Sequence, residues 1–436
     1  MKFKPYPKYK PSGVEWVGDI PEHWEVKRLK AVVTQVDRKV EAKEDLKLRF
    51  IGMEDVEPWV GRLLENTTET VPMGMANAFK KGNILFGKLR PYLAKACIAE
   101  SDGLCSTEFL VLESSALNKR FLLYTLLTEG MVKLIDSSTY GTKMPRASWD
   151  FIGNRPVLIP SCEEQVAIVR FLDERTKKVD VLIKRKQALI ERLKEKRAAL
   201  ISRTVTKGLP PQAARAAGLL VNPKMKDSGI EWLGAVPDHW EVKRLKFSAV
   251  TVMGQSPSSE DYTDDPTEIP FLQGNAEFGK RYPSASLFCD AASKKITVGA
   301  LLLSVRAPVG ALNEADKPYA IGRGLCAIVE NGRGLRKDFA WHALQLYRTE
   351  LASKATGSTY EAVSADDVGN IKIILPSLSE QQAITEFLDH ETGRIDELLK
   401  SVDKAIEQLQ EYRSALITAA VAGKINVSEV HCAQQI

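Results

Sequence analysis

The chain has 436 residues, which corresponds to two to four domains at roughly 100 to 200 residues each and excludes a single small module. Hydrophobic residues make up 44% and charged residues 27%, which excludes disordered and collagen-like chains. The 61 Lys and Arg against 56 Asp and Glu give a net charge of +5, too small over this length to indicate a polyanionic partner unless the charge is concentrated locally.

The six cysteines lie far apart and form no C-x-x-C pair, so we interpret them as reduced thiols and not as a disulfide framework or a zinc site. The N-terminus is basic but carries no apolar stretch, and the most apolar segment, 298–312, is interrupted by Arg306 and Pro308. We therefore expect a cytoplasmic protein with no membrane association.

An internal repeat dominates the sequence. Residues 12–30 read SGVEWVGDIPEHWEVKRLK and residues 228–246 read SGIEWLGAVPDHWEVKRLK, with 14 of 19 positions identical at an offset of 216. The P-S-x-x-E-Q and F-L-D segments recur at the same offset, so one module is present twice. The repeat duplicates two tryptophans, and we expect all four to anchor the framework or a partner subunit: Trp16, Trp24, Trp232 and Trp240.

Taken in chain order, short β-rich runs separated by Gly, Pro, Asn and Asp predict a mixed α/β domain with a substantial sheet in each half. A short helix is expected inside each domain, near 120–133 and 337–354. The predicted α+β organisation is an N-terminal segment with the first domain over 1–160, a long helix over 161–208, a linker over 209–227, the second domain over 228–376, a second long helix over 377–423 and a tail over 424–436.

Both long helices begin with a capping box, Ser161-x-x-Glu164 and Ser377-x-x-Glu380, directly after a proline. Apolar residues then recur at 3.5-type spacing, which is typical of helices that pair, and at about 1.5 Å per residue each rod would be roughly 65 to 70 Å long. The residues predicted to make the pairing seam are Leu182, Leu189, Leu193, Leu398, Val402 and Leu409.

Charge indicates the partner of each helix. Segment 161–207 has 13 Lys and Arg against 7 Asp and Glu, whereas segment 377–423 has 4 against 9. Because opposite charges on the flanks select coiled-coil partners, we predict that the helices pair antiparallel within one chain, with pseudo-two-fold symmetry and a domain at each end. Two alternatives stay open: surface helices that each pack on their own domain, and a basic helix that binds DNA along its length. The antiparallel arrangement predicts a split, asymmetric DNA target.

These residues resemble one family, the specificity subunit of type I restriction-modification systems. The resemblance rests on the duplicated G-x-E-W-x-G-x-x-P-x-H-W segment, the P-S-x-x-E-Q-x-x-I-x-x-F-L-D helix starts and the Leu-Ile-x-x-x-Val helix ends at 200–205 and 416–421. It implies two target recognition domains, a spacer of two antiparallel helices, double-stranded DNA as ligand, and two modification subunits and further restriction subunits as partners. It also implies a non-catalytic chain without cofactors, with S-adenosylmethionine on the modification subunit and ATP and Mg on the restriction subunit.

Two catalytic patterns fail on inspection. The P-D-H-W-E-V-K segment at 237–243 places its carboxylates too close for a nuclease, and Arg281 stands where a G-x-x-x-x-G-K loop needs Ser or Thr. We predict neither a catalytic nor a metal site.

Sequence is read by Arg, Lys, Asn, Gln, Ser and Thr at base edges, so the candidates are polar residues in the predicted loops. They are Lys88, Arg90, Tyr92, Thr139, Tyr140, Thr142, Lys143, Arg146, Gln273, Asn275, Lys280, Arg281, Arg306, Arg323, Ser358, Thr359 and Tyr360. A solvated or structural role stays open for each. We give most weight to Arg90, to Arg306 and to the two Ser-Thr-Tyr segments. The alternative functions are a protein scaffold without base-specific contact and a nuclease that acts alone.

Overall fold

The computed structural model describes residues 4–42, 48–64, 74–141, 143–355 and 362–427. The chain forms two compact units, unit 1 with Met1–Gln187 and Asp403–Ile436, and unit 2 with Ala188–Val402. These units differ from the domains predicted from sequence, because their boundaries fall inside the two long helices. Each unit takes the beginning of one long helix and the end of the other. No helix in the described residues is long and apolar enough to span a membrane.

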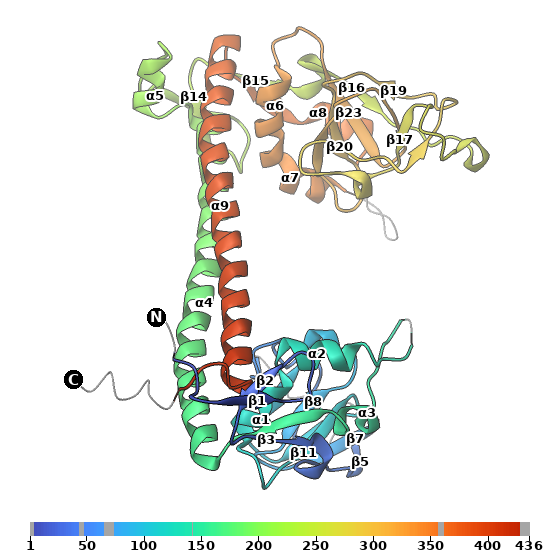
Figure 1. The fold of residues 1–436 in the computed structure, drawn as a ribbon. Helices are drawn as coiled ribbons and strands as arrows, with labels where there is room; N and C mark the ends of the chain where they lie inside the picture. Colours follow the sequence, from blue (N-terminus) through green and yellow to red (C-terminus); the bar gives the residue numbers. More distant parts are fainter. Residues whose placement is uncertain (1–3, 43–47, 65–73, 142, 356–361, 428–436) are drawn as a thin grey trace. The chain divides into compact units, whose positions relative to one another are not determined.

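Unit 1 contains two four-stranded sheets in its described residues, with strand orders β5-β7-β10-β6 and β4-β11-β8-β9, and the pairs β1-β2 and β12-β3 (Figure 1). Its strands are β1 (Tyr9–Pro11), β2 (Asp19–Pro21), β3 (Glu25–Arg28), β4 (Thr34–Gln35), β5 (Lys39–Ala42), β6 (Arg49–Ile51), β7 (Gly74–Phe79), β8 (Ile84–Gly87), β9 (Ala96–Ile98), β10 (Gly103–Ser106), β11 (Phe109–Glu113) and β12 (Pro156–Ile159). Its short helices are η1 (Leu29–Ala31), η2 (Pro91–Leu93), α1 (Lys119–Leu126), α2 (Glu129–Asp136) and α3 (Trp149–Gly153).

Strand β11 shows why the apolar runs of this unit form a central layer. Because successive side chains on a strand point to opposite faces, Phe109 and Val111 enter one buried cluster, and Leu110 and Leu112 enter another. The first cluster lies between the two sheets, and the second contains apolar residues of α1 and α2. A strand that is covered on both faces has no polar side, which explains its F-L-V-L sequence.

Unit 2 also contains two four-stranded sheets in its described residues, with the orders β16-β23-β20-β21 and β18-β17-β22-β19, and the pairs β13-β14 and β15-β24. Its strands are β13 (Met225–Asp227), β14 (Ala235–Pro237), β15 (Glu241–Arg244), β16 (Ala249–Met253), β17 (Pro270–Leu272), β18 (Leu287–Phe288), β19 (Lys295–Ile296), β20 (Leu301–Ser304), β21 (Leu312–Glu314), β22 (Tyr319–Ile321), β23 (Leu325–Glu330) and β24 (Lys372–Leu375). Its short helices are α5 (Pro211–Ala216), η3 (Leu245–Phe247), η4 (Ser259–Asp261), η5 (Asn275–Glu277), α6 (Lys337–Ala343), η6 (Leu344–Tyr347), α7 (Arg348–Lys354) and α8 (Ala365–Asn370). Strand β23 is antiparallel to β16 and β20, as β11 is to β4 and β8, so this sheet is repeated in the two halves. In the second sheet β17, β22 and β19 correspond to β6, β10 and β7, but the fourth strand differs, because β18 pairs with β17 whereas β5 pairs with β7.

The predicted long helices are α4 (Cys162–Lys207) and α9 (Leu378–Val421). Both predicted capping boxes are formed: the Ser161 amide donates to Glu164 (3.1 Å), and the Ser377 amide donates to Glu380 (3.2 Å). The helix expected near 120–133 is instead two helices, α1 and α2, which are separated at Leu127 and Thr128.

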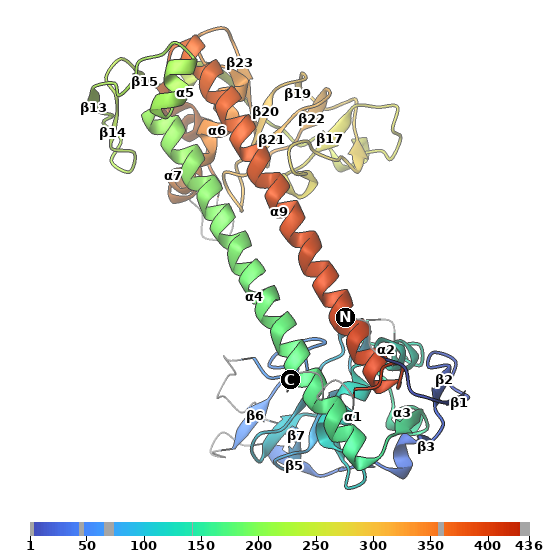
Figure 2. The ribbon, with the colours of Figure 1, turned by 60° about the vertical axis from the view of Figure 1, so that its left-hand side comes forward.

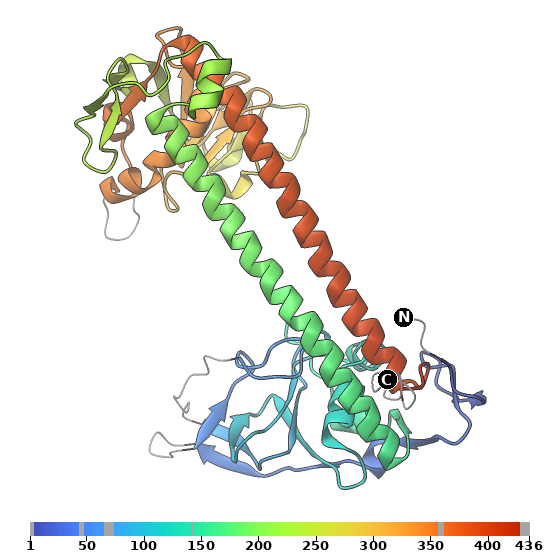
Figure 3. The same cartoon turned by 90° about the vertical axis from the view of Figure 1, so that its left-hand side faces the viewer.

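The long helices pack against each other inside each unit, in an antiparallel sense. In unit 1 the start of α4 shares a buried cluster with the end of α9 (Figure 2), through residues such as Leu172 and Leu416. In unit 2 the end of α4 shares a cluster with the start of α9 (Figure 3), through residues such as Val205 and Ile384. The predicted antiparallel pairing is confirmed, and the alternative of two unpaired surface helices is wrong.

Equivalent ion pairs join the two helices in the two units. Arg413 donates to Asp180 in unit 1 (2.9 Å), and Arg197 donates to Asp396 in unit 2 (3.2 Å). The pairs are equivalent, since both residues of one pair lie 216 positions from their counterparts in the other. The arginine comes from α9 in one pair and from α4 in the other. These two pairs therefore do not reflect the predicted attraction between a basic helix and an acidic helix.

The predicted pairing seam is partly wrong. Leu182, Leu189 and Leu398 are 46%, 43% and 53% exposed, whereas their neighbours Ile183, Ile190 and Leu399 are half-buried. The less exposed stripe also carries three residues of the predicted seam: Leu193, Val402 and Leu409. Leu182 and Leu189 have the seven-residue spacing of a pairing helix, but they lie on the exposed side of α4. Ile183 and Ile190 have the same spacing one residue later and lie on the less exposed side.

The N-terminal segment packs beside the end of α9. The Asn426 amide donates to the carbonyl of Lys4 (2.9 Å), and the Tyr9 hydroxyl donates to the carbonyl of Gly423 (3.2 Å). Residues 209–227, which the sequence left as an unplaced linker, take the corresponding place in unit 2, where they cover Trp240.

Candidate nucleic-acid interface

The duplicated tryptophans anchor the repeated segments to the long helices. Trp24 and Trp240 are 0% and 1% exposed, and their indole N–H groups donate to Glu164 (3.1 Å) and Glu380 (3.2 Å) at the helix starts. Each indole therefore ties the repeated segment to a capping box. The remaining two tryptophans lie differently in the two units. Trp16 is half-buried and packs on Gly130 of α2, whereas Trp232 is 45% exposed and contacts Tyr347 edge-on.

The capping glutamates are held in their charged form. Burial by itself raises the pKa of Glu164, but hydrogen bonds from its His, Trp and Ser partners outweigh burial and lower the pKa below its ordinary value. The pKa of Glu380 is lowered in the same way by the equivalent partners. His23 and His239 lie 2.9 Å and 2.7 Å from these carboxylates.

Acid should therefore destabilise both units through these carboxylates. A carboxylate whose pKa is lower in the folded state stabilises the fold fully at any pH above its pKa in the unfolded chain. This stabilisation is lost as the pH falls toward the pKa of the folded state, so for these glutamates the loss begins below about pH 4.5. The double variant Glu164→Gln and Glu380→Gln should show a flatter fall in melting temperature between pH 6 and pH 3. The control variant Glu15→Gln, at an exposed position, should keep the wild-type slope. Equal slopes in all three proteins would contradict this assignment.

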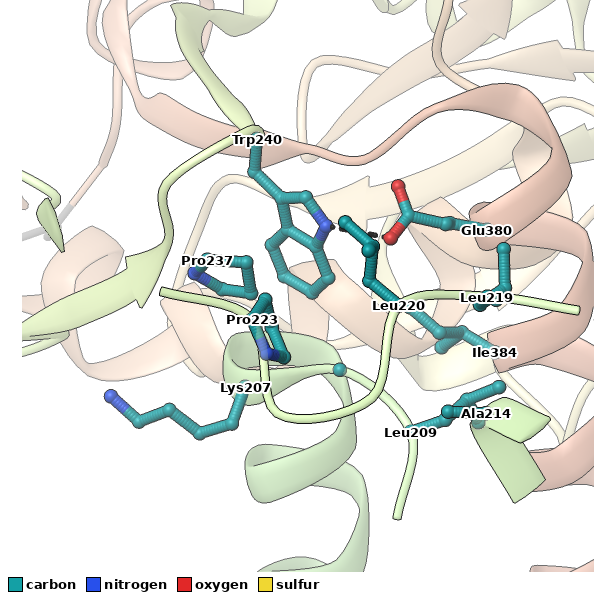
Figure 4. A pocket seen from close by; sticks show the side chains of 11 residues that line it. Lys207, Leu209, Ala214, Leu219, Leu220, Pro223, Pro237, Trp240, Glu380 and Ile384 are labelled. Carbon is teal, nitrogen blue, oxygen red and sulfur yellow. Dashed lines mark hydrogen bonds between the residues drawn. The ribbon is translucent and has the colours of Figure 1, made fainter. Parts of the chain in front are cut away.

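A small pocket lies beside Trp240, where the segment after α4 crosses the start of α9 (Figure 4). The indole and the carboxylate of Glu380 point toward each other there, and Leu219, Leu220 and Pro223 cover them. The cavity holds about 10 Å³, room for about one water molecule. This pocket is part of the packing between the segment after α4 and the start of α9, and it offers no space for a substrate. The described residues contain no group of three or more His, Cys, Asp or Glu that could hold a metal.

In unit 1 several of the predicted DNA-binding residues lie together after strand β8. The Arg90 amide donates to the carbonyl of Pro145 (2.8 Å), and Tyr140 and Arg146 exchange backbone hydrogen bonds (3.1 and 3.2 Å). The side chains of Arg90, Tyr140 and Lys143 are exposed, and Tyr92 follows Arg90 with 47% exposure. Two segments that are about 50 residues apart in sequence thus present cationic and aromatic groups on one surface.

Other candidates in unit 1 are engaged within the protein. The guanidinium of Arg146 makes a forked ion pair with Glu108 (2.8 to 3.1 Å), so it positions the loop. The Thr139 hydroxyl donates to the carbonyl of Asp136 at the end of α2 (2.8 Å). Lys88 is half-buried, and Thr142 lies outside the described residues.

Unit 2 places an equivalent surface after strand β20. Arg306 forms an isolated β-bridge with Ala362, as Leu89 does with Arg146 in unit 1. Arg306, Arg323 and Gln273 are exposed there, whereas Ser358, Thr359 and Tyr360 lie outside the described residues.

Three further candidates of unit 2 do not belong to this surface. Arg281 donates to Glu314 (2.8 Å), which pairs with Leu301 at the other end of β20. Lys280 lies 3.8 Å from Asp396 of α9. Lys280 therefore links the domain to α9, whereas Arg281 is held within the domain. Asn275 is half-buried at the start of η5.

The sequence analysis missed Gln255 and Ser256, which follow β16 after Gly254 and lie beside Arg323. The Arg323 amide approaches the Ser256 hydroxyl at 3.4 Å. The signal that could have found them is the change from an alternating strand to Gly-Gln-Ser at 254–256.

Two domains with the same central sheet, each presenting polar loops where its strands end, define a duplicated recognition protein. The family model of the type I restriction modification DNA specificity domain matches residues 21–192 and 237–408. Because these matches cover more than half of the sequence, the chain belongs to the family of type I restriction-modification specificity subunits. Specificity subunits are the DNA-binding, non-catalytic components of type I restriction enzymes.

Individual relatives match over nearly their whole length. The chain is 28% identical to the "Putative type I restriction enzyme MjaX specificity subunit" of Methanocaldococcus jannaschii, over 94% of this chain and 96% of that protein. It is 24% identical to the MjaVIII specificity subunit of the same organism, over 94% and 95%. A solved chain from work on complex assembly and conformational transition of the type I R-M system shares the fold with a TM-score of 0.68 at 24% identity, over 92% of this chain and 98% of that one. The HsdS subunit of Thermoanaerobacter tengcongensis gives 0.51 at 23% identity, over 93% and 98%.

Proposed function

We propose that the chain recognises a bipartite, asymmetric DNA target and that each domain reads one half of it. The supporting observation is that equivalent positions of one fold carry different side chains. Arg323 stands between β22 and β23, where the repeat places Thr107 between β10 and β11, and Ala362 stands where unit 1 has Arg146. A shared backbone with dissimilar loop residues reads two different sequences.

We also propose that the two modification subunits dock on the repeated segments. Lys27 and Arg28 of β3 are identical to Lys243 and Arg244 of β15, and all four residues are exposed. Exposed positions that serve no core are free to diverge after a duplication, so their identity supports one kind of partner bound twice. The bound modification subunits supply S-adenosylmethionine, restriction subunits supply ATP and Mg, and this chain holds no cofactor.

The test is enrichment of a random double-stranded DNA library by the chain reconstituted with its modification subunit. We expect a split motif with two unlike halves, and mass measurement should give two modification subunits per chain. Exchanging residues 31–160 for those of another family member should change one half only. If no motif is enriched, the alternative function of a protein scaffold without base contact replaces this proposal. Cleavage of DNA by the isolated chain with Mg would instead support the nuclease.

A further inference from the structure

We propose that Arg323 and Gln255 are the base-reading pair of the second domain, with Arg323 contacting a guanine and Gln255 an adenine in the major groove. The inference rests on the proposed function and assigns specificity residues within it. Strands β16, β17 and β20 (Figure 1) carry the neighbouring segments of this surface.

Close backbone contacts bring the ends of several strands together at this point. The Gln255 amide donates to the carbonyl of Ile321 (2.9 Å), and the Val305 amide donates to the carbonyl of Gly324 (2.9 Å). The turn that carries Arg323 is therefore tied to the end of β16 on one side and to the end of β20 on the other. Arg306, the next residue after Val305, is thereby brought to the same surface.

Three glycines allow this approach. A Cβ atom on Gly254 would clash with the carbonyl oxygen of Gly322, and one on Gly324 would lie 2.6 Å from the carbonyl oxygen of Gln273. Gly322 and Gly324 flank Arg323 directly. Only a turn without side chains at both flanking positions packs this tightly, so the backbone of Arg323 is fixed while its side chain points out to solvent.

The side chains at this surface suit base edges. The guanidinium of Arg323 is exposed and has no hydrogen bond or ion pair within the described residues, unlike Arg146 and Arg281, which are held by glutamates. A free guanidinium matches the O6 and N7 acceptors of guanine with two parallel hydrogen bonds.

The side-chain amide of Gln255 is held so that it can bind adenine. Its Oε1 atom accepts a hydrogen bond from the Ser293 hydroxyl (3.1 Å), which leaves the amide NH₂ group and the second lone pair of the oxygen for a ligand. An amide in this state can donate to N7 of adenine and accept from its N6 amino group. Because glutamine has no charge, it adds nothing to general phosphate attraction, and its place beside Arg323 favours base readout over phosphate binding.

The experiment enriches a DNA library with the reconstituted complex that carries Arg323→Lys, which keeps the charge but removes the fork. We expect preference for one guanine in one half of the motif to fall by about 10- to 100-fold, with the other half unchanged. Gln255→Leu should lower preference for one adenine in the same half. The matched control is Arg333→Lys, an exposed arginine that also stands between two glycines but at the other end of β23, and it should leave every base preference unchanged.

The outcomes distinguish failure of the proposed function from failure of the base-reading pair. A wild-type complex that enriches no motif would overturn the proposed function. A wild-type motif that both variants reproduce unchanged would overturn the base-reading pair alone. If Arg323→Lys lowers the melting temperature, Arg323→Gln serves as the second substitution, and a motif that is unaltered in a folded protein of either type contradicts the inference.

Discussion

Replacing Arg413 with alanine should lower the free energy of unfolding of unit 1 by about 3–5 kcal/mol. The side chain is 8% exposed, and its guanidinium donates to Asp180 (2.9 Å) and to the carbonyls of Trp59 (2.9 Å) and Val60 (3.2 Å). Truncation would leave two carbonyls without their donor and would leave the largely buried Asp180 carboxylate with its longer ion pair to Arg62 (3.7 Å), which costs more than a surface pair is worth. Urea unfolding of the full chain, followed by fluorescence, measures the loss.

The repeat supplies the matched control. Arg197→Ala removes the equivalent ion pair with Asp396, but there the side chains are 31% and 27% exposed. Within the described residues the guanidinium of Arg197 donates to no backbone carbonyl, unlike that of Arg413. We expect a loss of about 1 kcal/mol or less, because water replaces the partner. Equal losses in the two variants would show that burial does not set the strength of these pairs.

Replacing Trp24 with alanine should cost about 3–5 kcal/mol, and so should replacing Trp240. Each indole is almost completely buried and forms the hydrogen bond that joins the repeated segment to its helix start. Alanine would leave a cavity in the core and a capping glutamate without one of its donors. Thermal unfolding monitored by calorimetry compares the variants with the wild-type chain.

Two substitutions separate the contributions to this loss. Trp24→Phe keeps most of the ring volume and removes the N–H donor, and should cost about 1–2 kcal/mol. Trp232→Ala should lower the free energy of unfolding clearly less than Trp240→Ala, because the Trp232 side chain is half-exposed and buries less surface than that of Trp240. A Trp24→Ala protein as stable as the Trp24→Phe protein would contradict the cavity argument.

Features with local or periodic causes were predictable from the sequence. The capping boxes involve residues three apart, so Ser161 and Glu164 located a helix start without tertiary information. The repeat likewise predicted a duplicated fold, and the apolar spacing predicted paired helices. The phase of the pairing seam was not predictable, because Leu182 and Ile183 follow the same seven-residue repeat and only packing against α9 distinguishes them.

The candidate site was predictable by region and not by residue. The sequence does not distinguish three candidate arginines, namely Arg146, Arg281 and Arg323. In the structure the first two are paired with glutamates, and the third is exposed. That difference depends on residues distant in sequence, Glu108 and Glu314, which no local pattern connects to the arginines. The contribution of Gln255 depends in turn on tight contacts between glycine backbones.

The hydrogen bonds between the N-terminal segment and the residues after α9 make the linear order of this protein partly arbitrary. Lys4 and Asn426 are bonded to each other, and the exposed residue Asn222 lies in the segment that fills the corresponding place in the other half. A circular permutant that begins at Asn222, with a linker between residues 436 and 1, would keep these contacts. In that permutant the second recognition domain would be synthesised before the first. The order of the two halves in the chain is thus separable from the contacts that hold each half together.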